Sequence, residues 1–348
     1  MNPIQPAAAT AAGARTMKAA TYRRFGGPDV VRVEEIAQPA PRAGEVLIKV
    51  MASTVSVADH RVRSRNVPKG LVALTALALG VFRPRTRVLG MDVAGVVESI
   101  SPGVTAFRAG DEVIAMLGAG FGGHAEYVSV PANGPIAAKP RNMGFEEAVT
   151  LLFGGLTAKT FLGMAAIKTG DTVLINGASG AVGTAAIQLA KHLGAHVTAV
   201  SSGANKELVE SLGADSFIDY TAVDFTADGT TYDVVMDCVG NAPFARVQRS
   251  IAPGGALLLV IADLKGMLGA RGQSRRSGKL VTFGGLKLTY TADDVAYLVG
   301  LAEEGKYRAV IDRTYNLADV VEAHRFVDTG RKRGNVVLRV HQLQGQTS

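Results

Sequence analysis

The chain has 348 residues, a length typical of two domains. Hydrophobic residues make up 47% and charged residues 19%, which excludes a largely disordered protein. The single cysteine, Cys238, excludes intramolecular disulfides and a multi-cysteine metal site, and it favours a reducing, cytoplasmic location. The net charge of +7 comes with basic clusters, but no nucleic-acid recognition motif accompanies them, so we expect no nucleic-acid partner.

Residues 1–16 are rich in alanine and lack the pattern of a signal peptide, so we expect a disordered tail, with Met17 an alternative start. From residue 17 to 139, short strand-like runs alternate with Gly and Pro, which predicts a β-rich domain. The apolar segment 71–82 is too short to span a bilayer, so stable membrane insertion is not expected. Three interpretations remain open for it: a wall over the substrate, a membrane-surface helix between basic flanks, and a core helix.

From residue 140 to 287, strands and helices alternate, which predicts a parallel sheet covered by helices. Expected helices cover 183–193 and 206–212, and the expected strands are 171–176, His196–Ser201, Ser216–Asp219, Tyr232–Asp237, 255–261 and Leu280–Phe283. Two helices near 292–304 and 317–329 and a strand at 336–340 should return to the first domain. The prediction is therefore one domain of residues 17–139 and 288–348, and a second of residues 140–287.

The segment that follows the first strand of the second domain is rich in glycine and runs into a helix. A pyrophosphate requires backbone N–H groups at a helix N-terminus and no side chain in its way. Ser179, Gly180, Ala181 and Val182 are expected to meet it, and Gly183 to let the helix pack on the strand. The first glycine of the usual pattern is alanine here, so the prediction depends on the order of strand, loop, helix and strand.

The end of the second strand distinguishes the two nicotinamide dinucleotides, because an acidic residue there would bind the ribose 2′-hydroxyl of NAD. The chain has Ser201 and Ser202 at that position, followed by Lys206, and Tyr220 follows the third strand. These residues predict NADPH, with Lys206 or Tyr220 near the 2′-phosphate. Lys206 also fits an ordinary surface residue of a helix.

Further motifs carry a resemblance to a known family. GMDVAG at residues 90–95, GDEV at 110–113 and GGHAEYV at 122–128 precede the glycine-rich loop at suitable spacing. Together they resemble the medium-chain dehydrogenase/reductase superfamily, and within it the zinc-free quinone oxidoreductase branch. The resemblance implies an α/β fold with a GroES-like β-barrel catalytic domain and a Rossmann cofactor domain, and a substrate bound between them.

The same resemblance implies further cofactor contacts. Thr157 matches a position that contacts the phosphate or the nicotinamide, although a helix-capping hydroxyl fits it equally well. The other positions expected near the nicotinamide are Gly240, Ile261, Ala262, Gly284, Gly285 and Asn335.

Zinc-dependent relatives place a cysteine ligand in the stretch that matches residues 54–59 and a Gly-His-Glu triplet where this chain has Gly90, Met91 and Asp92. Both the thiolate and the imidazole are missing, so no metal is predicted. Without a Lewis acid to stabilise an alkoxide, the expected acceptors are quinones and α,β-unsaturated carbonyls, which accept hydride more readily than ketones.

Candidate catalytic residues are Ser56, Asp59 and Arg63. Ser56 stands where quinone reductases often carry an asparagine, and Asp59 and Arg63 fit a structural ion pair better than a substrate contact. His124, Glu126 and Tyr127 are expected in the core, and Cys238 in packing. No residue is an obvious proton donor, which leaves solvent.

Two other functions stay open. Arg83–Arg87 and Arg271–Arg276 would suit the phosphates of an enoyl thioester, and an NADPH-binding protein without turnover is the alternative from another class. A homodimer through the edge strand Leu280–Phe283 is expected.

Overall fold

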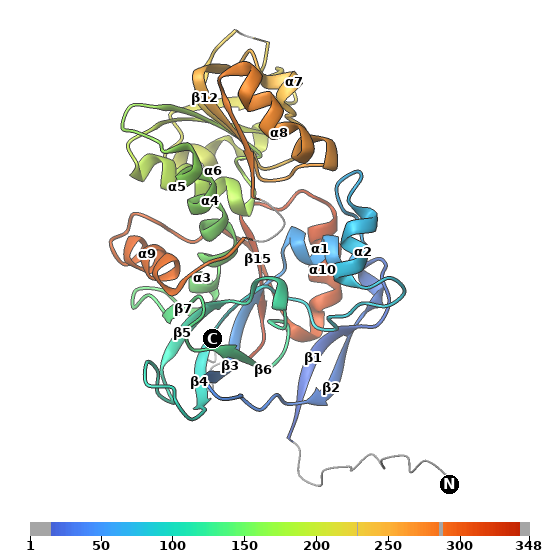
Figure 1. Ribbon diagram of the computed structural model, residues 1–348. Coiled ribbons are helices and arrows are strands. Elements are labelled where there is room, and N and C mark those ends of the chain that lie inside the picture. The colour runs from blue at the N-terminus through green and yellow to red at the C-terminus, as the bar shows by residue number, and fades with distance from the viewer. Residues whose placement is uncertain (1–14, 228, 285–287, 342–348) are drawn as a thin grey trace.

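The computed structural model describes residues 15–227, 229–284 and 288–341, which form two sheet-containing parts (Figure 1). Six parallel strands make the sheet of the upper part in the order β10-β9-β8-β11-β12-β13. The bounds of these strands are β8 Thr172–Asn176, β9 His196–Ser201, β10 Ser216–Asp219, β11 Tyr232–Asp237, β12 Ile251–Leu259 and β13 Leu280–Phe283. The chain winds outward from β8 and again from β11, so these central neighbours mark the switch point where such sheets bind ligands.

The helices of the upper part bury small and aliphatic side chains against this sheet. Their bounds are α4 Leu152–Ala165, α5 Ala181–His192, α6 Lys206–Ser211, α7 Phe244–Val247 and α8 Leu264–Ser277. Helix α4 lies so close to the first turn of α5 that a Cβ at Gly154 would stand 2.3 Å from the carbonyl oxygen of Ala181. Helices α4, α7 and α8 were not predicted from the sequence.

The lower part is a curled, mainly antiparallel sheet in the order β14-β15-β3-β4-β5-β7, with β6 on the free stretch of β3 (Figure 1). The bounds are β3 Glu45–Thr54, β4 Asp92–Ile100, β5 Glu112–Met116, β6 Tyr127–Pro131, β7 Ile136–Ala138, β14 Ile311–Asn316 and β15 Asn335–Arg339. Val46, Ile48, Val93, Val113 and Val128 belong to one buried cluster enclosed by its strands. The pairing of Val337 on β15 with Thr54 on β3 shows that the chain returns to the first sheet.

Strands β1 (Thr16–Tyr22) and β2 (Val31–Ala37) form a separate antiparallel pair. Thr16 pairs with Ala37, and the carbonyl of Arg15 accepts the N–H of Gln38, so these residues belong to the folded chain and not to the tail predicted for residues 1–16. The remaining helices are α1 Val57–Ser64, α2 Val72–Leu79, α3 Phe145–Val149, α9 Ala292–Glu303 and α10 Val320–Asp328.

Strands β8 to β13 belong to the upper sheet, and β3 to β7, β14 and β15 belong to the lower one, while the domain division itself stays a prediction. Among the described residues, one helical segment, Phe145–Ala165, is apolar and long enough to cross a membrane, but 67% of its most apolar stretch is buried inside the protein. It is therefore a core segment. Helix α2, by contrast, has no buried residue, so the interpretation of segment 71–82 as a core helix is wrong.

Candidate functional site

The glycine-rich loop stands at the carboxyl end of β8, at the switch point of the parallel sheet. Two of its glycines are required by the protein itself. A Cβ at Gly177, whose φ is +83°, would lie 2.7 Å from Val239, and a Cβ at Gly183 would lie 2.2 Å from the carbonyl oxygen of Gly177. Gly180 differs, because its Cβ would meet nothing closer than 3.6 Å. The space above Gly180 is open to a ligand.

Gly180 is the N-cap residue of α5. Its carbonyl accepts the N–H of Thr184 at 2.8 Å, which begins the helical ladder and leaves the N–H of Val182 without an intrahelical partner, while the parallel bridge between Gly180 and Gly334 engages the N–H of Ala181. The donor on Val182 and the helix dipole suit an anion such as a pyrophosphate. The loop therefore stands at the start of a helix, and its contact with a pyrophosphate stays a prediction.

A hydroxyl and amide cluster joins the loop to the end of β9. The hydroxyl of Ser201 lies 2.8 Å from that of Ser179, and the side-chain N–H₂ of Asn205 donates to Ser201 at 2.9 Å and to Ser202 at 3.0 Å. Asn205 was not singled out in the sequence, because an isolated asparagine after a strand fits any turn. It links the predicted pair of serines to Ser179 of the phosphate loop, whose hydroxyl lies 3.2 Å from the Asn205 amide nitrogen.

Two further predicted residues border this cluster. The N–H of Tyr220 donates to the carbonyl of Ser201 at 3.2 Å, and Tyr220 is 59% exposed. Lys206 lies exposed at the start of α6, 3.8 Å from Glu210. A carboxylate also stands nearby. Asp219 accepts hydrogen bonds from the hydroxyl and backbone of Thr221 and from the backbone of Gly203, the residue after Ser202, and these bonds lower its pKa.

The loop after β11 faces the phosphate loop from the other side of the switch point. It is held by Asp237, which is fully buried and accepts the N–H groups of Val239, Gly240 and Ala242 at 2.8–3.0 Å. A Cβ at Gly240 would lie 2.9 Å from Ile261, so the structure brings these two predicted cofactor residues into contact. Asp237 is a positioning residue that sequence reasoning missed.

The other predicted contacts are less direct. Thr157 lies in the middle of α4 and donates to the carbonyl of Phe153 at 2.7 Å, so it does not cap a helix. Ala262 precedes α8, and Gly284 packs against Phe161 of α4. Asn335 is buried, and its side chain donates to the carbonyl of Val310 at 3.2 Å. Gly285 lies outside the described residues.

The loop before β15 also reaches the phosphate loop. The N–H of Gly334 donates to the carbonyl of Ser179 at 2.8 Å, and Gly334 forms a parallel bridge with Gly180. The ammonium of Lys332 lies 2.5 Å from the carbonyl of Gly334. Burial lowers the pKa of Lys332 to about 8. Within the basic run at residues 331–333, only the fold distinguishes this lysine from its neighbours.

The three catalytic candidates are held by structural contacts. Ser56 caps α1, and its hydroxyl lies 2.6 Å from the carboxylate of Asp59, which also accepts the N–H of Gly90 at 2.8 Å. Arg63 is fully buried and binds Asp328 at 2.6 Å, so the expected ion pair between Asp59 and Arg63 is wrong. Asp59 is bonded to Ser56 and Gly90, and Arg63 is bonded through both terminal nitrogens while its buried Nε has no partner among the described residues, so these contacts favour a structural role.

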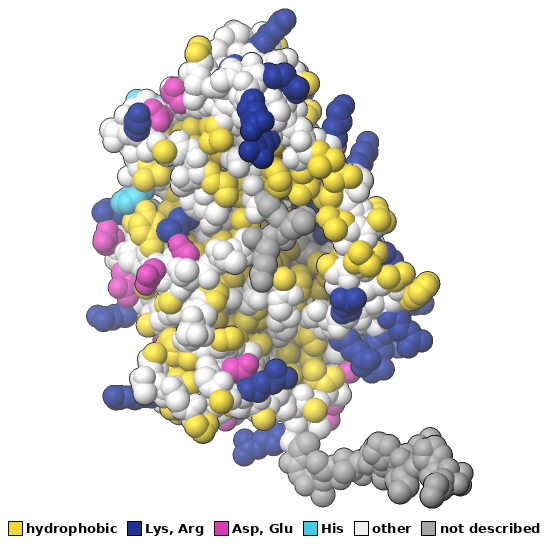
Figure 2. Space-filling view, viewed as in Figure 1, with side chains coloured by type: hydrophobic (Ala, Val, Ile, Leu, Met, Phe, Trp, Pro, Cys, Tyr) yellow, Lys and Arg dark blue, Asp and Glu magenta, His cyan; other side chains and the backbone are white. Residues whose placement is uncertain are grey.

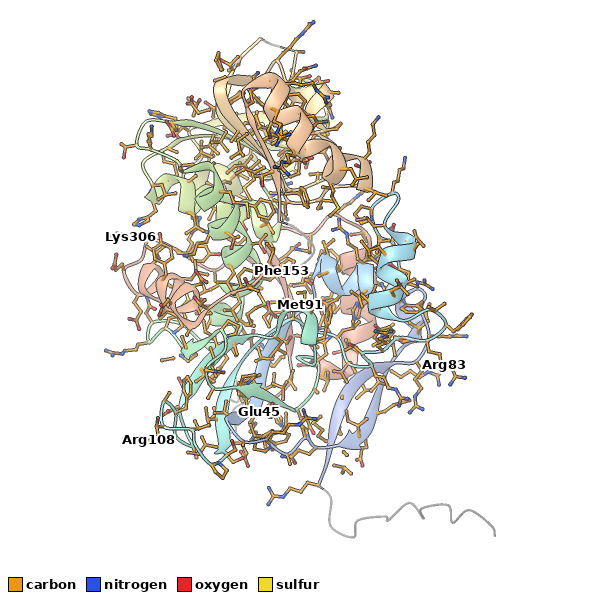
Figure 3. The ribbon with its side chains drawn as sticks, viewed as in Figure 1. Glu45, Arg83, Met91, Arg108, Phe153 and Lys306 are labelled. Carbon is orange, nitrogen blue, oxygen red and sulfur yellow. The ribbon has the colours of Figure 1, made fainter. Side chains whose placement is uncertain are left out.

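The residues around Met91 show whether a zinc ion would fit. Met91 and Phe153 lie where the two parts of the molecule meet (Figure 3). Asp92 is fully buried and accepts two hydrogen bonds from Thr54 at 2.8–2.9 Å, while burial raises its pKa to about 7. His124 is bonded through Nε2 to the carbonyl of Thr54. Residues 15–227, 229–284 and 288–341 contain no group of three His, Cys, Asp or Glu residues that could hold a metal. The donors present do not fit zinc.

Comparisons with known proteins agree with this architecture. The family described as "Alcohol dehydrogenase GroES-like domain" matches residues 42–141, and "Zinc-binding dehydrogenase" matches residues 212–338. The chain is 33% identical to the chloroplastic quinone-oxidoreductase QR1 of Triphysaria versicolor over 93% of its own length and 98% of that protein. It is 31% identical to a chloroplastic NADPH-dependent alkenal/one oxidoreductase of Arabidopsis thaliana, over 93% of this chain and 80% of that protein. The quinone oxidoreductase of Coxiella burnetii superposes with a TM-score of 0.81 at 30% identity, covering 94% and 100%.

The doubly wound sheet, its phosphate loop and the returning antiparallel sheet define an oxidoreductase dependent on a nicotinamide dinucleotide. The expected fold class, a GroES-like domain with a Rossmann domain, is confirmed. The chain belongs to the medium-chain dehydrogenase/reductase superfamily, in its quinone-oxidoreductase-like branch.

Proposed function

We propose that the protein transfers hydride from NADPH to quinones or α,β-unsaturated carbonyls, and that it does so without a metal ion. Two observations carry the proposal. The space that a Cβ of Gly180 would occupy is open, and the end of β9 carries serine and asparagine side chains where an NAD-binding protein would carry an acidic residue. The bound nicotinamide would supply the hydride. The protein's own part is to hold, orient and shield the reactants.

The choice of NADPH depends on the end of β9. Ser201 and Ser202 offer hydroxyl groups there, and Lys206 and Tyr220 stand exposed beside them. A 2′-phosphate at this edge would meet donors and one ammonium group. The carboxylate of Asp219 is held by Thr221 and by the backbone of Gly203, so it borders this edge, and the Lys206 ammonium and the hydroxyl groups would have to outweigh its charge.

The choice of acceptor depends on the residues around Met91. A simple ketone needs a Lewis acid or a strong proton donor to stabilise the alkoxide. Met91 offers a thioether there, and Asp92 and His124 are bonded to Thr54. Quinones and enones delocalise the negative charge themselves, so hydrogen-bond donors or solvent suffice. The Ser56 hydroxyl faces Asp59, which favours solvent as the proton source.

The proposal also includes a cytoplasmic location, since a chain with a single cysteine forms no internal disulfide and suits a reducing compartment. It further includes a homodimer. Strand β13 lies at the edge of the parallel sheet, where it would pair with the same strand of a second copy.

The test is a screen for NADPH oxidation across quinones, enones and enoyl thioesters, with NADH as the control cofactor. We expect turnover with quinones or enones and a preference for NADPH. Turnover confined to enoyl thioesters would replace the proposed acceptor, and tight NADPH binding without any turnover would indicate a binding protein.

A further inference from the structure

Helix α2 and the turn after it expose a run of apolar side chains to solvent. Val72 is 56% exposed, Leu77 is 65% exposed and Phe82 is 91% exposed. Residues 70–82 contain no charged residue. Exposed apolar residues scattered singly are ordinary, but a helix without any buried residue that is also uncharged is not.

The backbone of this segment is firmly anchored, so the exposure is built into the fold. The carbonyl of Lys69 accepts the N–H of Leu264 at 3.0 Å, and Arg65 donates to the carbonyl of Val81 at 2.9 Å. Arg85 donates its N–H to the carbonyl of Leu79 at 2.9 Å. A Cβ at Gly80, where φ is +110°, would lie 2.0 Å from the carbonyl oxygen of Arg83. Phe82, which follows this turn, is therefore exposed on an anchored backbone.

The apolar surface continues onto α8 across the contact between the two parts of the molecule. Gly70 packs against Leu264, and Leu268, one turn further along α8, is 77% exposed. Figure 2 shows hydrophobic side chains extending along this flank from α8 down to α2. We call the surface formed by Val72, Leu74, Leu77, Phe82 and Leu268 the apolar flank.

Positive charge borders the apolar flank. Arg83, Arg85 and Arg87 follow Phe82 directly, and Figure 2 shows dark blue side chains beside the hydrophobic ones. None of these three arginines forms an ion pair within the described parts of the chain. A neighbouring pocket of about 630 Å³ is lined by Phe82, Arg83 and Arg87, and it adds Arg23, Arg24 and Arg32 together with the carboxylates of Asp29 and Glu34, which leaves an excess of positive charge.

We propose that the apolar flank docks on the surface of an anionic lipid bilayer. Leucine and phenylalanine side chains would enter the acyl boundary while the arginines meet lipid phosphates, as in helices that lie in the membrane interface. A second copy of this chain fits less well, because a twofold contact through this surface would bring like arginine clusters together. A nucleic acid also fits less well, because Leu77 and the other aliphatic side chains can neither donate hydrogen bonds nor stack on bases.

The docked orientation has a consequence that rests on the proposed function. The flank adjoins Leu264, two residues after Ala262 and three after Ile261, which contacts Gly240. The candidate nicotinamide side would therefore lie near the bilayer, where apolar quinones concentrate. Docking itself does not require turnover, so the two claims fail separately.

The test is flotation of the full chain with vesicles of phosphatidylcholine, with and without about one third phosphatidylglycerol. We expect binding to the anionic vesicles, weakened by salt, and little binding to the neutral ones. The double variant L77E and F82E should bind at least about tenfold more weakly, whereas I100E, an exposed apolar site on β4, should bind like the wild type.

The charge is tested by a matched pair of double variants. R83Q with R85Q should lose binding to anionic vesicles about tenfold, and R108Q with K306Q should lose much less, because Arg108 and Lys306 lie on the opposite flank from Arg83 (Figure 3). Unchanged melting temperatures show that each variant is folded. The proposal is overturned if the wild type does not float with anionic vesicles, if L77E with F82E floats as well as the wild type, or if light scattering shows that these substitutions only dissociate a dimer.

Discussion

The backbone N–H of Gly334 donates to the carbonyl oxygen of Ser179 at 2.8 Å, and this bond ties the last loop of the chain to the phosphate loop. Gly334 adopts a φ of +59°, and a Cβ there would stand 2.3 Å from the carbonyl oxygen of Val310. The position therefore requires glycine, for both conformation and space. Because of this contact, Lys332 lies beside the loop that we expect to hold the pyrophosphate.

Lys332 makes the proposed NADPH affinity dependent on pH. The pKa of Lys332 is lowered to about 8 by burial, so its ammonium is charged below pH 8 and loses its charge above it. Bound NADPH would stabilise the charged lysine and raise its pKa. We therefore expect the affinity for NADPH to fall by about tenfold as the pH rises from 8 to the higher pKa of Lys332 in the complex. Calorimetric titration at several pH values measures this.

The variant K332M should bind NADPH more weakly at neutral pH and lose this dependence. The neighbouring exposed residue gives the control, because R331M should keep it. If K332M retained the wild-type pH profile, Lys332 would not act at the cofactor site.

Gly180 and Gly183 should respond differently to the same change. A Cβ at Gly180 meets open space and one at Gly183 meets the carbonyl of Gly177 at 2.2 Å. We expect G180A to weaken NADPH binding at least about tenfold while changing the unfolding free energy by less than about 1 kcal/mol. G183A should lower that free energy by about 2 kcal/mol. Chemical denaturation and cofactor titration check both, and equal NADPH affinity of G180A and wild type would remove the ligand from this loop.

The cofactor preference should reverse when an acidic residue is placed after β9. Ser202 lies within 3.0 Å of Asn205 at the expected 2′-phosphate position. S202D should weaken NADPH binding at least about tenfold by repulsion and leave NADH binding nearly unchanged. S202N is the uncharged control. A parallel loss for both cofactors would place the adenosine ribose elsewhere.

Arg63 should prove structural. Its side chain is fully buried and holds Asp328 and the carbonyl of Gly26. R63M should lower the unfolding free energy by about 3 kcal/mol, because it removes the buried guanidinium from Asp328 and leaves His60 as the remaining partner of that carboxylate, with little change in kcat/KM of the folded protein. The exposed Arg108 supplies the control R108M. A large loss of kcat/KM with full stability would restore the catalytic role.

His324 should make the protein sensitive to acid. It is fully buried, neither ring nitrogen has a hydrogen-bond partner among the described residues, and burial holds its pKa well below the ordinary value. The unfolded chain takes up a proton below about pH 6.5 and the folded chain does not. The unfolding free energy should therefore fall as pH drops below 6.5, by up to about 1.4 kcal/mol per pH unit. H324L should reduce this slope in denaturation curves between neutral and mildly acidic pH, and an unchanged slope would assign it to other groups.

Strands with continuous apolar runs could be predicted well from the sequence. The predicted bounds of Ser216–Asp219, Tyr232–Asp237 and Leu280–Phe283 coincide with β10, β11 and β13. The strand expected at 255–261 begins earlier, at Ile251, because Gly254 and Gly255 continue the strand and do not open it. Helix α8 was missed because Gly266, Gly269 and Gly272 interrupt its apolar pattern.

Features that depend on the tertiary fold could not be predicted. Composition does not tell whether an apolar segment such as α2 is buried, because that depends on what packs over it. The partner of Arg63 is Asp328, 265 residues away, and no local pattern indicates it. Asn205 and Lys332 likewise acquire a possible role only when the fold brings them to the phosphate loop.

The most direct test of the account uses NADPH deuterated at the transferable position of its nicotinamide ring. The protein is first dialysed against a metal chelator and then given an enone, and the product is examined by mass spectrometry and NMR. The account predicts turnover with one deuterium at the carbon β to the carbonyl. A product without deuterium, or turnover that appears only when zinc is restored, would contradict it.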